Sequence, residues 1–391
     1  MASRMTIAAE DLAARLDPLR AIGFDPARGT NRLAWTDADA AAGAWFEEQA
    51  AGAGLRAWRD AAGNRWATPP GDGPWWAVGS HTDSVRDGGA FDGALGVAAA
   101  FAIAAASDAP LAVISFADEE GARFNTPTFG SRALTGVLDV EGVLARRDDD
   151  DVSLADAMAA AGVDPAGLGA APDALRHLRG FVELHIDQST DLAAAGAPWG
   201  IVASLAARLR LRATTTGTAD HAGTTPMDGR QDALLAAARL VTAAHDLCTP
   251  DMRATVGRLL VEPNALTAIA AGTTLWIDAR APEAATLDPW LTALTTAAPL
   301  GTTLATESQS PAVTFDAGLR ARLAAAAPSA AAPSAPELVC WAGHDAGLLA
   351  PRVPAAMVLV RNATGISHSP AEHVELVDAA AGATAILHAL S

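Results

Sequence analysis

The chain has 391 residues, half of them apolar, and a formal net charge of −18 at pH 7. Because a charge of this sign repels phosphate groups, nucleic acids and anionic membrane surfaces are excluded as expected partners. The length exceeds what one hydrophobic core usually serves, so two compact domains are expected.

The sequence contains no segment of membrane-spanning length. Its longest apolar run, "ALGVAAAFAIAAA" from Ala94, is shorter than the roughly 20 residues that a spanning helix requires. Charged residues interrupt the first segment before an apolar stretch of signal-peptide type can form. Cys248 and Cys340 lie far apart and form neither a zinc-spaced pair nor a disulfide framework. We therefore expect a cytoplasmic protein.

The first part of the chain alternates between apolar strands and helices. The strand "WWAVGSH" from Trp75 is followed by a glycine-rich loop, a helix from Ala94 and the strand "LAVISFADEE" from Leu111. A further apolar strand, "GFVELHID", begins at Gly180. This alternation predicts an α/β domain with a largely parallel sheet covered on both faces, in which ligand sites gather at the carboxyl ends of the strands.

Residues of metal-ligand type follow several of these strands or sit in the adjoining loops. They are His81, Asp92, Glu120, His185 and His368. Two imidazoles and a bridging carboxylate, with one further ligand for each ion, can hold a pair of divalent cations. Asp92, in the glycine-flanked "AFDGA", suits the bridge. Zinc is the first expectation, and manganese, cobalt and nickel remain alternatives.

The adjacent carboxylates Glu119 and Glu120 predict a division of roles, because neighbouring side chains at a strand end point in different directions. We assign Glu120 as a ligand and Glu119 as the general base for the attacking water. Asp83, two residues after His81, is expected to accept a hydrogen bond from the second imidazole nitrogen of His81 and fix its tautomer.

Asp148 to Asp151 form an acidic run that resembles a metal site in composition. Consecutive side chains on a loop diverge, however, so we expect this run to be a solvated loop.

Near Ala206 the pattern changes to strands with one polar face. The predicted elements are a strand (207–216), a helix (229–246), strands (254–262 and 273–280), a helix (282–297) and a strand (301–308). This βαββαβ order predicts a ferredoxin-like domain inserted into the first one. The expected division is therefore a catalytic domain (1–205 and 311–391) and an inserted domain (206–310).

Motifs distributed along the chain resemble one known family. "GSHTDSV", "GGAFDGALGV", "FADEEGARF", "ELHIDQ", "DHAGTTPM", "VGRLLVEPN", "AGHDAG" and "GISHSPAEH" are similar to motifs of the amidase, hydantoinase and carbamoylase family, a branch of the dinuclear-metal aminoacylase and exopeptidase superfamily. The resemblance implies a zinc-exopeptidase-like catalytic domain, two divalent metal ions, and an inserted domain that serves as a lid and in homodimerisation.

The resemblance implies the same five ligands and the same base as the chemistry above. It also implies that His221, in the inserted domain, stabilises the oxyanion of the tetrahedral intermediate. Arg280 would bind the substrate carboxylate through two hydrogen bonds. Gln188 and His344 match family positions close to the substrate.

Three positions depart from the family pattern. Ser189 and Thr190 replace a glycine and a proline after the ligand strand. Thr267 replaces an asparagine whose amide contacts substrate, so the hydrogen bonding to substrate is expected to change there.

The resemblance is strongest to the allantoate amidohydrolase branch, and it predicts hydrolysis of a linear amide or ureido bond in a small carboxylated molecule. The alternatives are an N-carbamoyl-L-amino-acid hydrolase or β-ureidopropionase, and an N-acyl amino acid hydrolase. A non-catalytic binding protein is a third possibility, which the complete set of ligands and Glu119 disfavours.

Overall fold

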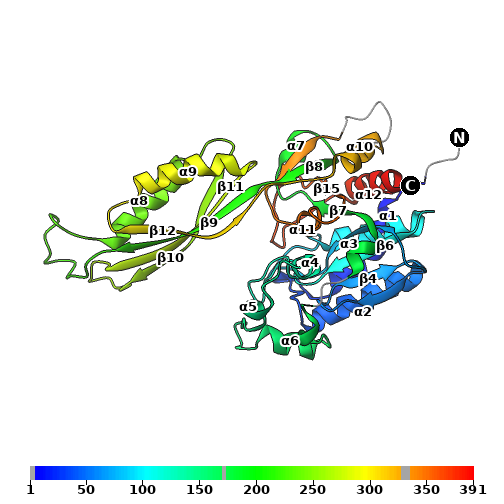
Figure 1. Ribbon diagram of the computed structural model, residues 1–391, viewed down its shortest axis with the longest axis horizontal. Coiled ribbons are helices and arrows are strands. Elements are labelled where there is room, and N and C mark those ends of the chain that lie inside the picture. Colours follow the sequence, from blue (N-terminus) through cyan, green and yellow to red (C-terminus); the bar gives the residue numbers. More distant parts are fainter. Residues whose placement is uncertain (1–4, 170–172, 327–334) are drawn as a thin grey trace. The chain divides into compact units, whose positions relative to one another are not determined.

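The computed structural model describes residues 5–169, 173–326 and 335–391. These residues form two compact units (Figure 1): the described parts of 1–203, 314–338 and 343–391 make the larger unit, and 204–313 with 339–342 make the smaller. Residues 339–342 group with the smaller unit although β14 (Glu337–Cys340) pairs with β8 of the large sheet, and the N–H of Ala206 donates to the carbonyl of Cys340 at 2.9 Å.

Among the described residues, the larger unit contains a nine-stranded sheet with the order β13-β8-β15-β7-β5-β6-β4-β3, and β14 pairs with β8. Its strands are β3 (Arg56–Arg59), β4 (Arg65–Thr68), β5 (Trp75–His81), β6 (Leu111–Phe116), β7 (Leu178–Ile186), β8 (Trp199–Leu205), β13 (Val313–Thr314), β14 (Glu337–Cys340) and β15 (Ala355–Val360). The central strands β15, β7, β5 and β6 are parallel, which confirms the predicted mixed, largely parallel sheet.

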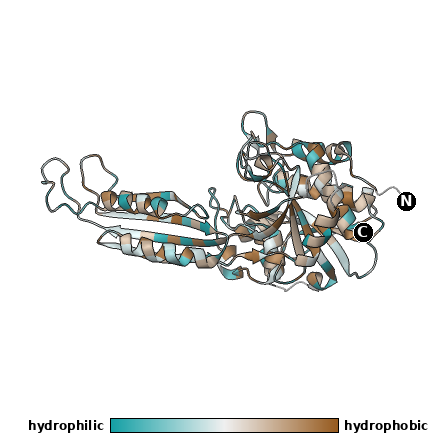
Figure 2. Cartoon of the chain, turned by 90° about the horizontal axis from the view of Figure 1, so that it is seen from above, coloured by the Kyte–Doolittle hydropathy of each residue, from teal (hydrophilic) through white to brown (hydrophobic). Residues whose placement is uncertain are grey.

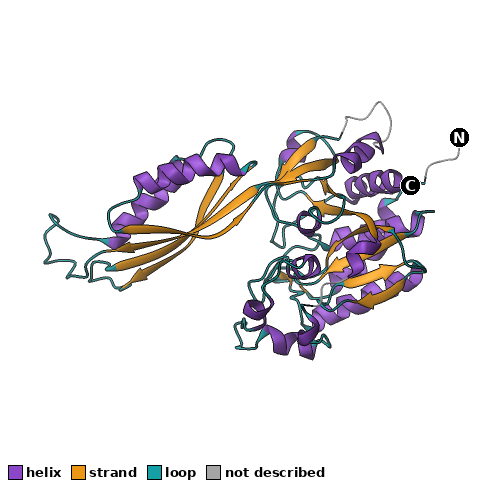
Figure 3. Ribbon diagram, in the orientation of Figure 1, coloured by secondary structure: helices purple, strands orange, loops and turns teal. Residues whose placement is uncertain are grey.

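The helices of the larger unit cover this sheet (Figure 3). They are α1 (Ala9–Ala21), α2 (Asp37–Gly52), α3 (Ala94–Ala106), α4 (Phe129–Thr135), α5 (Val140–Leu144), α6 (Leu154–Ala160), α7 (Asp191–Ala194), α10 (Ala317–Ala326), α11 (Asp345–Leu349) and α12 (Leu376–Leu390). Two 3₁₀ helices (Pro165–Gly167 and Asp173–His177) and the short pair β1 (Phe24–Asp25) and β2 (Gly29–Thr30) complete it.

Helix α3 is the centre of the core. It is apolar on all sides and rich in alanine, a composition that favours a fully buried helix. One side packs against β5, β6 and β7, and α1 and α12 pack against it from other directions. The Phe101 ring of α3 lies 4.9 Å from that of Phe46 and 5.9 Å from that of Trp45. Figure 2 shows the apolar strands and helices gathered in this unit.

The smaller unit has the predicted βαββαβ order. Its elements are β9 (Ala207–Thr216), α8 (Ala233–Asp246), β10 (Arg253–Glu262), β11 (Gly272–Ala281), α9 (Ala284–Ala297) and β12 (Thr302–Ser310). Its strands are antiparallel in the order β10-β11-β9-β12, with α8 and α9 on one face. Helix α8 begins four residues later than predicted, because the Asp232 carboxylate accepts the N–H groups of Leu234 and Leu235 and caps the helix there.

No helix among the described residues is long and apolar enough to cross a bilayer.

Gly96 allows α3 to approach the strands that end in His81 and His185. A Cβ atom at this position would overlap the Leu184 carbonyl oxygen and lie 2.7 Å from the Ser80 Cβ. Gly96→Ala should therefore lower the free energy of unfolding by about 1–3 kcal/mol. Gly52→Ala, also in a helix but with nothing within 4 Å of the new atom, is the matched control and should be neutral or stabilising. Equal chemical-denaturation curves for the two variants would contradict this account of the packing.

Candidate metal centre

Parallel strands bring the predicted ligands to one edge of the sheet. His81 is the last residue of β5, Glu119 and Glu120 follow β6, and His185 is the second-last residue of β7. His368 lies in the loop after β15, and Asp92 lies in the loop that leads into α3. The carboxyl ends of β15, β7, β5 and β6 point the same way, so all of these side chains belong to one side of the larger unit.

The carboxylate of Asp92 is the centre of the cluster. Its Oδ1 lies 3.4 Å from His81 Nε2 and 3.0 Å from His185 Nε2. Its Oδ2 lies 3.4 Å from His368 Nε2, and that nitrogen lies 3.4 Å from Glu120 Oε1. Two groups of three ligand atoms, each within 4.8 Å, therefore share Asp92: one with His81 and His185, the other with Glu120 and His368.

These residues fit divalent metal ions. Atoms that bind a tetrahedral zinc at about 2.0–2.1 Å lie about 3.3–3.4 Å from one another, close to the spacings around Asp92. Within the described part of the chain, His185 Nε2 and Glu120 Oε1 are buried and have no hydrogen-bond partner. Buried polar atoms without partners are costly, and a bound cation would satisfy both.

The tautomers of two imidazoles suit metal binding. His81 Nδ1 lies 3.0 Å from the carbonyl of Asp83, and His185 Nδ1 lies 3.1 Å from the carbonyl of Ile186. A carbonyl only accepts, so Nδ1 carries a hydrogen in both rings, and Nε2, which faces Asp92, is the nitrogen left to bind a cation. Gly93 is required beside His81, since any Cβ there would overlap the imidazole.

Asp83 acts differently from the sequence prediction. Its carbonyl, and not its carboxylate, contacts His81 at hydrogen-bond distance, and Oδ1 is 3.6 Å from the ring nitrogen. The carboxylate instead accepts the backbone N–H groups of Glu119 at 3.2 Å and Glu120 at 3.1 Å. The reason is that the turn after β5 directs this side chain toward the loop after β6. Asp83 therefore holds both the imidazole and the two glutamates.

Crowding of carboxylates sets the electrostatics of the cluster. Burial and the charge of Asp92 raise the pKa of Glu120 to about 7, and burial raises the pKa of Glu119 well above its usual range. The hydrogen bond to Asp92 raises the pKa of His368 to about 9. Burial opposes ionisation of Asp92, but the surrounding imidazoles outweigh it and hold its pKa well below the usual range. Glu119 Oε2 lies 3.9 Å from His81 Nε2, within reach of the cluster but outside both groups around Asp92.

Gln188 and His344 also lie at this cluster. Gln188 Nε2 donates to Asp92 Oδ2 at 3.0 Å. His344 is buried, its ring lies 4.4 Å from that of His185, and neither of its nitrogens has a partner among the described residues. Burial and the neighbouring His185 lower the pKa of His344 well below its usual range, so this imidazole is neutral.

The departure at Ser189 has a local structural use. Its N–H and hydroxyl both donate to Asp187 Oδ1, at 2.8 and 2.7 Å. The turn after β7 is thus closed by side-chain hydrogen bonds in place of a glycine and proline.

His221 and Thr267 lie together in the smaller unit, where Ala222 N–H donates to the Thr267 carbonyl at 2.9 Å. His221 Nδ1 accepts the N–H groups of Gly223 and Thr224, at 3.0 and 3.1 Å. Since Nδ1 is an acceptor, the neutral ring carries its hydrogen on Nε2. Arg230 donates to the carbonyls of Ala222, Thr225 and Pro226 and holds this loop. The loop therefore presents Nε2–H as a donor.

Arg280 lies at the opposite end of the same sheet. It donates to Asp278 Oδ1 at 2.7 Å and to the carbonyl of Trp341. His221 pairs with Ala268, which lies beyond the Gly272 end of β11. Arg280 is on the same strand, eight residues after Gly272. At the rise of an extended strand, eight residues span about 27 Å.

Two residues of this region were not predicted from the sequence. Glu372 and Ser367 contact Asp92 or its backbone, and they belong to the quoted "GISHSPAEH" motif, which was the only signal for them. The prediction of a solvated acidic run was wrong for Asp148, whose buried carboxylate accepts from Arg123 at 2.9 Å. Asp149 and Asp151 are exposed as expected.

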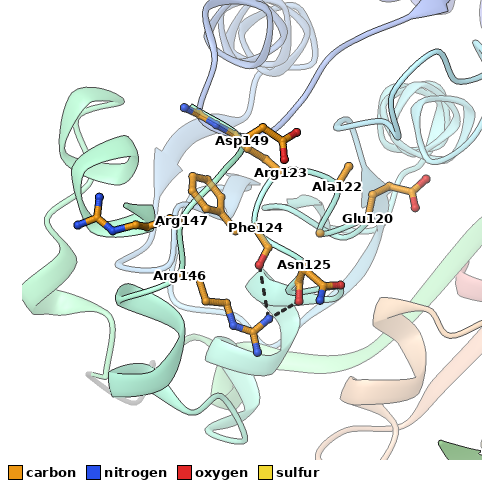
Figure 4. A pocket seen from close by; sticks show the side chains of 9 residues that line it. Glu120, Ala122, Arg123, Phe124, Asn125, Arg146, Arg147 and Asp149 are labelled. Atoms are coloured by element: carbon orange, nitrogen blue, oxygen red, sulfur yellow. Dashed lines mark hydrogen bonds between the residues drawn. The ribbon is translucent and has the colours of Figure 1, made fainter. Parts of the chain in front are cut away.

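A pocket of about 650 Å³ lies between the loop after Glu120 and the segment 146–149 (Figure 4). Arg146 closes one side by donating to the carbonyls of Phe124 and Asn125. The Glu120 carboxylate is directed away from Arg146 and Arg147 in Figure 4, and Glu120 is the only predicted ligand that lines the pocket. Among the predicted ligands, Glu120 alone belongs both to this pocket and to the cluster around Asp92.

Comparison with known proteins places this arrangement in a family. Residues 69–391 match the peptidase family M20/M25/M40. The chain belongs to this family. The predicted resemblance is thereby confirmed.

Full-length members with similar sequences are amidohydrolases. An N-carbamoyl-L-amino acid amidohydrolase of Geobacillus stearothermophilus is 36% identical over 98% of both chains. An allantoate amidohydrolase of Bacillus subtilis is 34% identical over 76% of this chain and 75% of its own. The crystal structure of a hydantoinase/carbamoylase family amidase from Burkholderia multivorans has a TM-score of 0.86, with 31% identity over 99% of this chain and 98% of the other.

Binding of a divalent ion should stabilise the chain, because it relieves the repulsion among buried carboxylates and binds only the folded state. Zinc added to chelator-treated protein should raise the unfolding temperature by several degrees. His185→Ala should lose most of this shift, while His373→Ala, an exposed histidine outside the cluster, should keep it. A zinc response that is equal in the two variants would show that zinc binds elsewhere.

Proposed function

We propose that the protein is a metal-dependent amidohydrolase that cleaves the ureido or amide bond of a small carboxylated molecule. The observation that carries the proposal is the pair of ligand groups sharing Asp92, with the carboxylate of Glu119 3.9 Å from His81 Nε2. Membership of the M20 family and the amidohydrolase relatives support it.

We further propose that two divalent ions bind, with Asp92 as their bridge. One would be held by His81 and His185 and the other by Glu120 and His368. Bound ions would lower the pKa of water toward neutrality and polarise the scissile carbonyl. Zinc suits these nitrogen and oxygen ligands, and manganese, cobalt and nickel suit them as well.

The side chains of the protein supply the remaining steps. Glu119 takes a proton from the attacking water and returns it to the leaving nitrogen. The Nε2–H of His221 donates to the oxyanion of the tetrahedral intermediate. Arg280, held by Asp278 and Trp341, binds the substrate carboxylate. For a ureido substrate, water attacks the carbonyl carbon and the C–N bond breaks, which gives an amine and a carbamate. The carbamate decomposes to carbon dioxide and ammonia.

The proposed site requires two copies of the chain. The loop of His221 lies beyond the Gly272 end of β11, and the strand from Gly272 to Arg280 spans about 27 Å, which is far longer than a small ureido acid. We infer that His221 and Arg280 of one subunit do not contact the same substrate. We propose a homodimer in which a second copy supplies one of these residues. Leu259 and Leu260 are exposed on the edge strand β10, a surface on which a second copy can pair.

The substrate is proposed as allantoate or an N-carbamoyl amino acid. Relatives of both kinds have similar identity to this chain. Thr267, beside His221, offers a hydroxyl where the family has an asparagine amide, so we expect it to influence the choice between them. Hydrolysis of an N-acyl amino acid, the alternative, uses the same chemistry, and its products distinguish it from hydrolysis of a ureido substrate.

Incubation of the zinc-loaded protein with allantoate, N-carbamoyl amino acids and N-acyl amino acids, with ammonia and free amine as readouts, tests the reaction class. We expect ammonia from a ureido substrate. Glu119→Gln should lower turnover by about 10²–10⁴-fold while the ion content, measured by emission spectrometry, stays the same. Hydrolysis of N-acyl compounds alone would replace the ureido proposal, and a fully active Glu119→Gln would contradict the role of the base.

Mixing two inactive variants tests the shared site. His221→Ala and Arg280→Ala should each be strongly impaired. After subunit exchange, half of the dimers are mixed, and each mixed dimer has one intact site. The mixture should therefore recover about a quarter of wild-type activity. A mixture no more active than the separate variants would place His221 and Arg280 in the same subunit's site.

A further inference from the structure

The hydroxyl of Ser367 lies between two carboxylates. Its Oγ is 3.1 Å from Asp92 Oδ2 and 3.0 Å from Glu372 Oε2. Gln188 Nε2 donates to the same oxygen of Asp92 and lies 3.2 Å from Ser367 Oγ. A hydroxyl has one hydrogen and an amide has two. Ser367 can therefore donate to only one of the two carboxylates at a time, whereas Gln188 can donate to Asp92 and Ser367 together.

Glu372 is held firmly in place beside Ser367. Its Oε1 accepts the backbone N–H groups of Phe91 and Asp92, both at 2.9 Å. The side chain is buried, and Gly89 makes room for it, because a Cβ atom at Gly89 would lie 2.6 Å from the Glu372 Cβ. With Oε1 occupied, the remaining oxygen Oε2 faces Ser367 as an acceptor.

Hydrogen-bond donors and a cation compete for the lone pairs of Asp92 Oδ2. Ser367 and Gln188 both donate to this oxygen, the one nearer to His368. A cation shared with His368 would displace at least one of these donors. The hydroxyl of Ser367 has a second acceptor within reach in Glu372, so its hydrogen loses no partner when it turns.

We propose that Ser367 and Glu372 form a donor switch that frees Asp92 Oδ2 for ion binding. With a cation at Asp92 Oδ2, the Ser367 hydroxyl donates to Glu372 Oε2 instead, while Gln188 keeps the Ser367 oxygen as an acceptor. This inference rests on the proposed function, because it requires ions at Asp92. Ser367 and Glu372 touch no reacting atom and act as positioning residues.

Glu372→Gln reverses the direction of the hydrogen bond between Ser367 and residue 372. The amide oxygen of the new side chain must face the two backbone N–H groups, so its NH₂ group faces Ser367 and donates. The hydrogen of Ser367 is then left for Asp92 alone. Titration of Zn²⁺ into chelator-treated, full-length protein, followed by calorimetry, should show affinity about 10-fold or more below wild type. Glu375→Gln, which removes an exposed carboxylate three residues away, is the control for the loss of charge.

The Ser367→Ala background separates the switch from a structural role of Glu372. Without the hydroxyl, the penalty of Glu372→Gln should shrink by at least about threefold. Ser367→Ala alone should bind Zn²⁺ at least as tightly as wild type, because one competing donor is gone. An equal penalty in both backgrounds, no penalty in either, or a loss of affinity in Ser367→Ala alone would overturn the proposal. The titration contains no substrate, so its outcome is independent of whether the protein hydrolyses ureido compounds.

Discussion

The larger unit is organised around the carboxylate of Asp92, which lies within 3.0–3.4 Å of three imidazole nitrogens. These imidazoles come from β5, β7 and the loop after β15, so the arrangement depends on three parallel strands that end at one edge of the sheet. Close approach of α3 through Gly96 and of the Asp92 loop through Gly93 keeps that edge compact. Cations bound between these buried ionisable groups would offset part of the cost of burying them.

Much of this organisation could be predicted from the sequence. Apolar strands such as "WWAVGSH" and "GFVELHID" locate His81 and His185 at strand ends, because the period and length of an apolar run define the strand. The parallel arrangement of the strands then places their carboxyl ends at one edge of the sheet. Contacts that depend on side-chain direction could not be predicted. Asp83 is two residues from His81, yet its carboxylate turns to the backbone of Glu119 and Glu120. Glu372 is distant in sequence from Asp92, and only folding brings its oxygen to the Asp92 N–H.

The smaller unit adds a constraint of its own. The loop of His221 lies beyond the Gly272 end of β11 and Arg280 lies near its other end, and hydrogen bonds fix both. The two ends of a rigid sheet of this length cannot both contact one small substrate. If both residues serve the same reaction, the distance itself demands a second subunit, and the exposed leucines of β10 offer a surface for one.

The central claim is that Asp92 bridges two divalent ions. Diffraction from crystals of the zinc-loaded protein at wavelengths on either side of the zinc absorption edge locates these ions without any assumption about activity. The account predicts two anomalous peaks about 3.5–4 Å apart, one beside His81 and His185 and the other beside Glu120 and His368, with Asp92 between them. A single peak, or peaks that do not share Asp92, would contradict it.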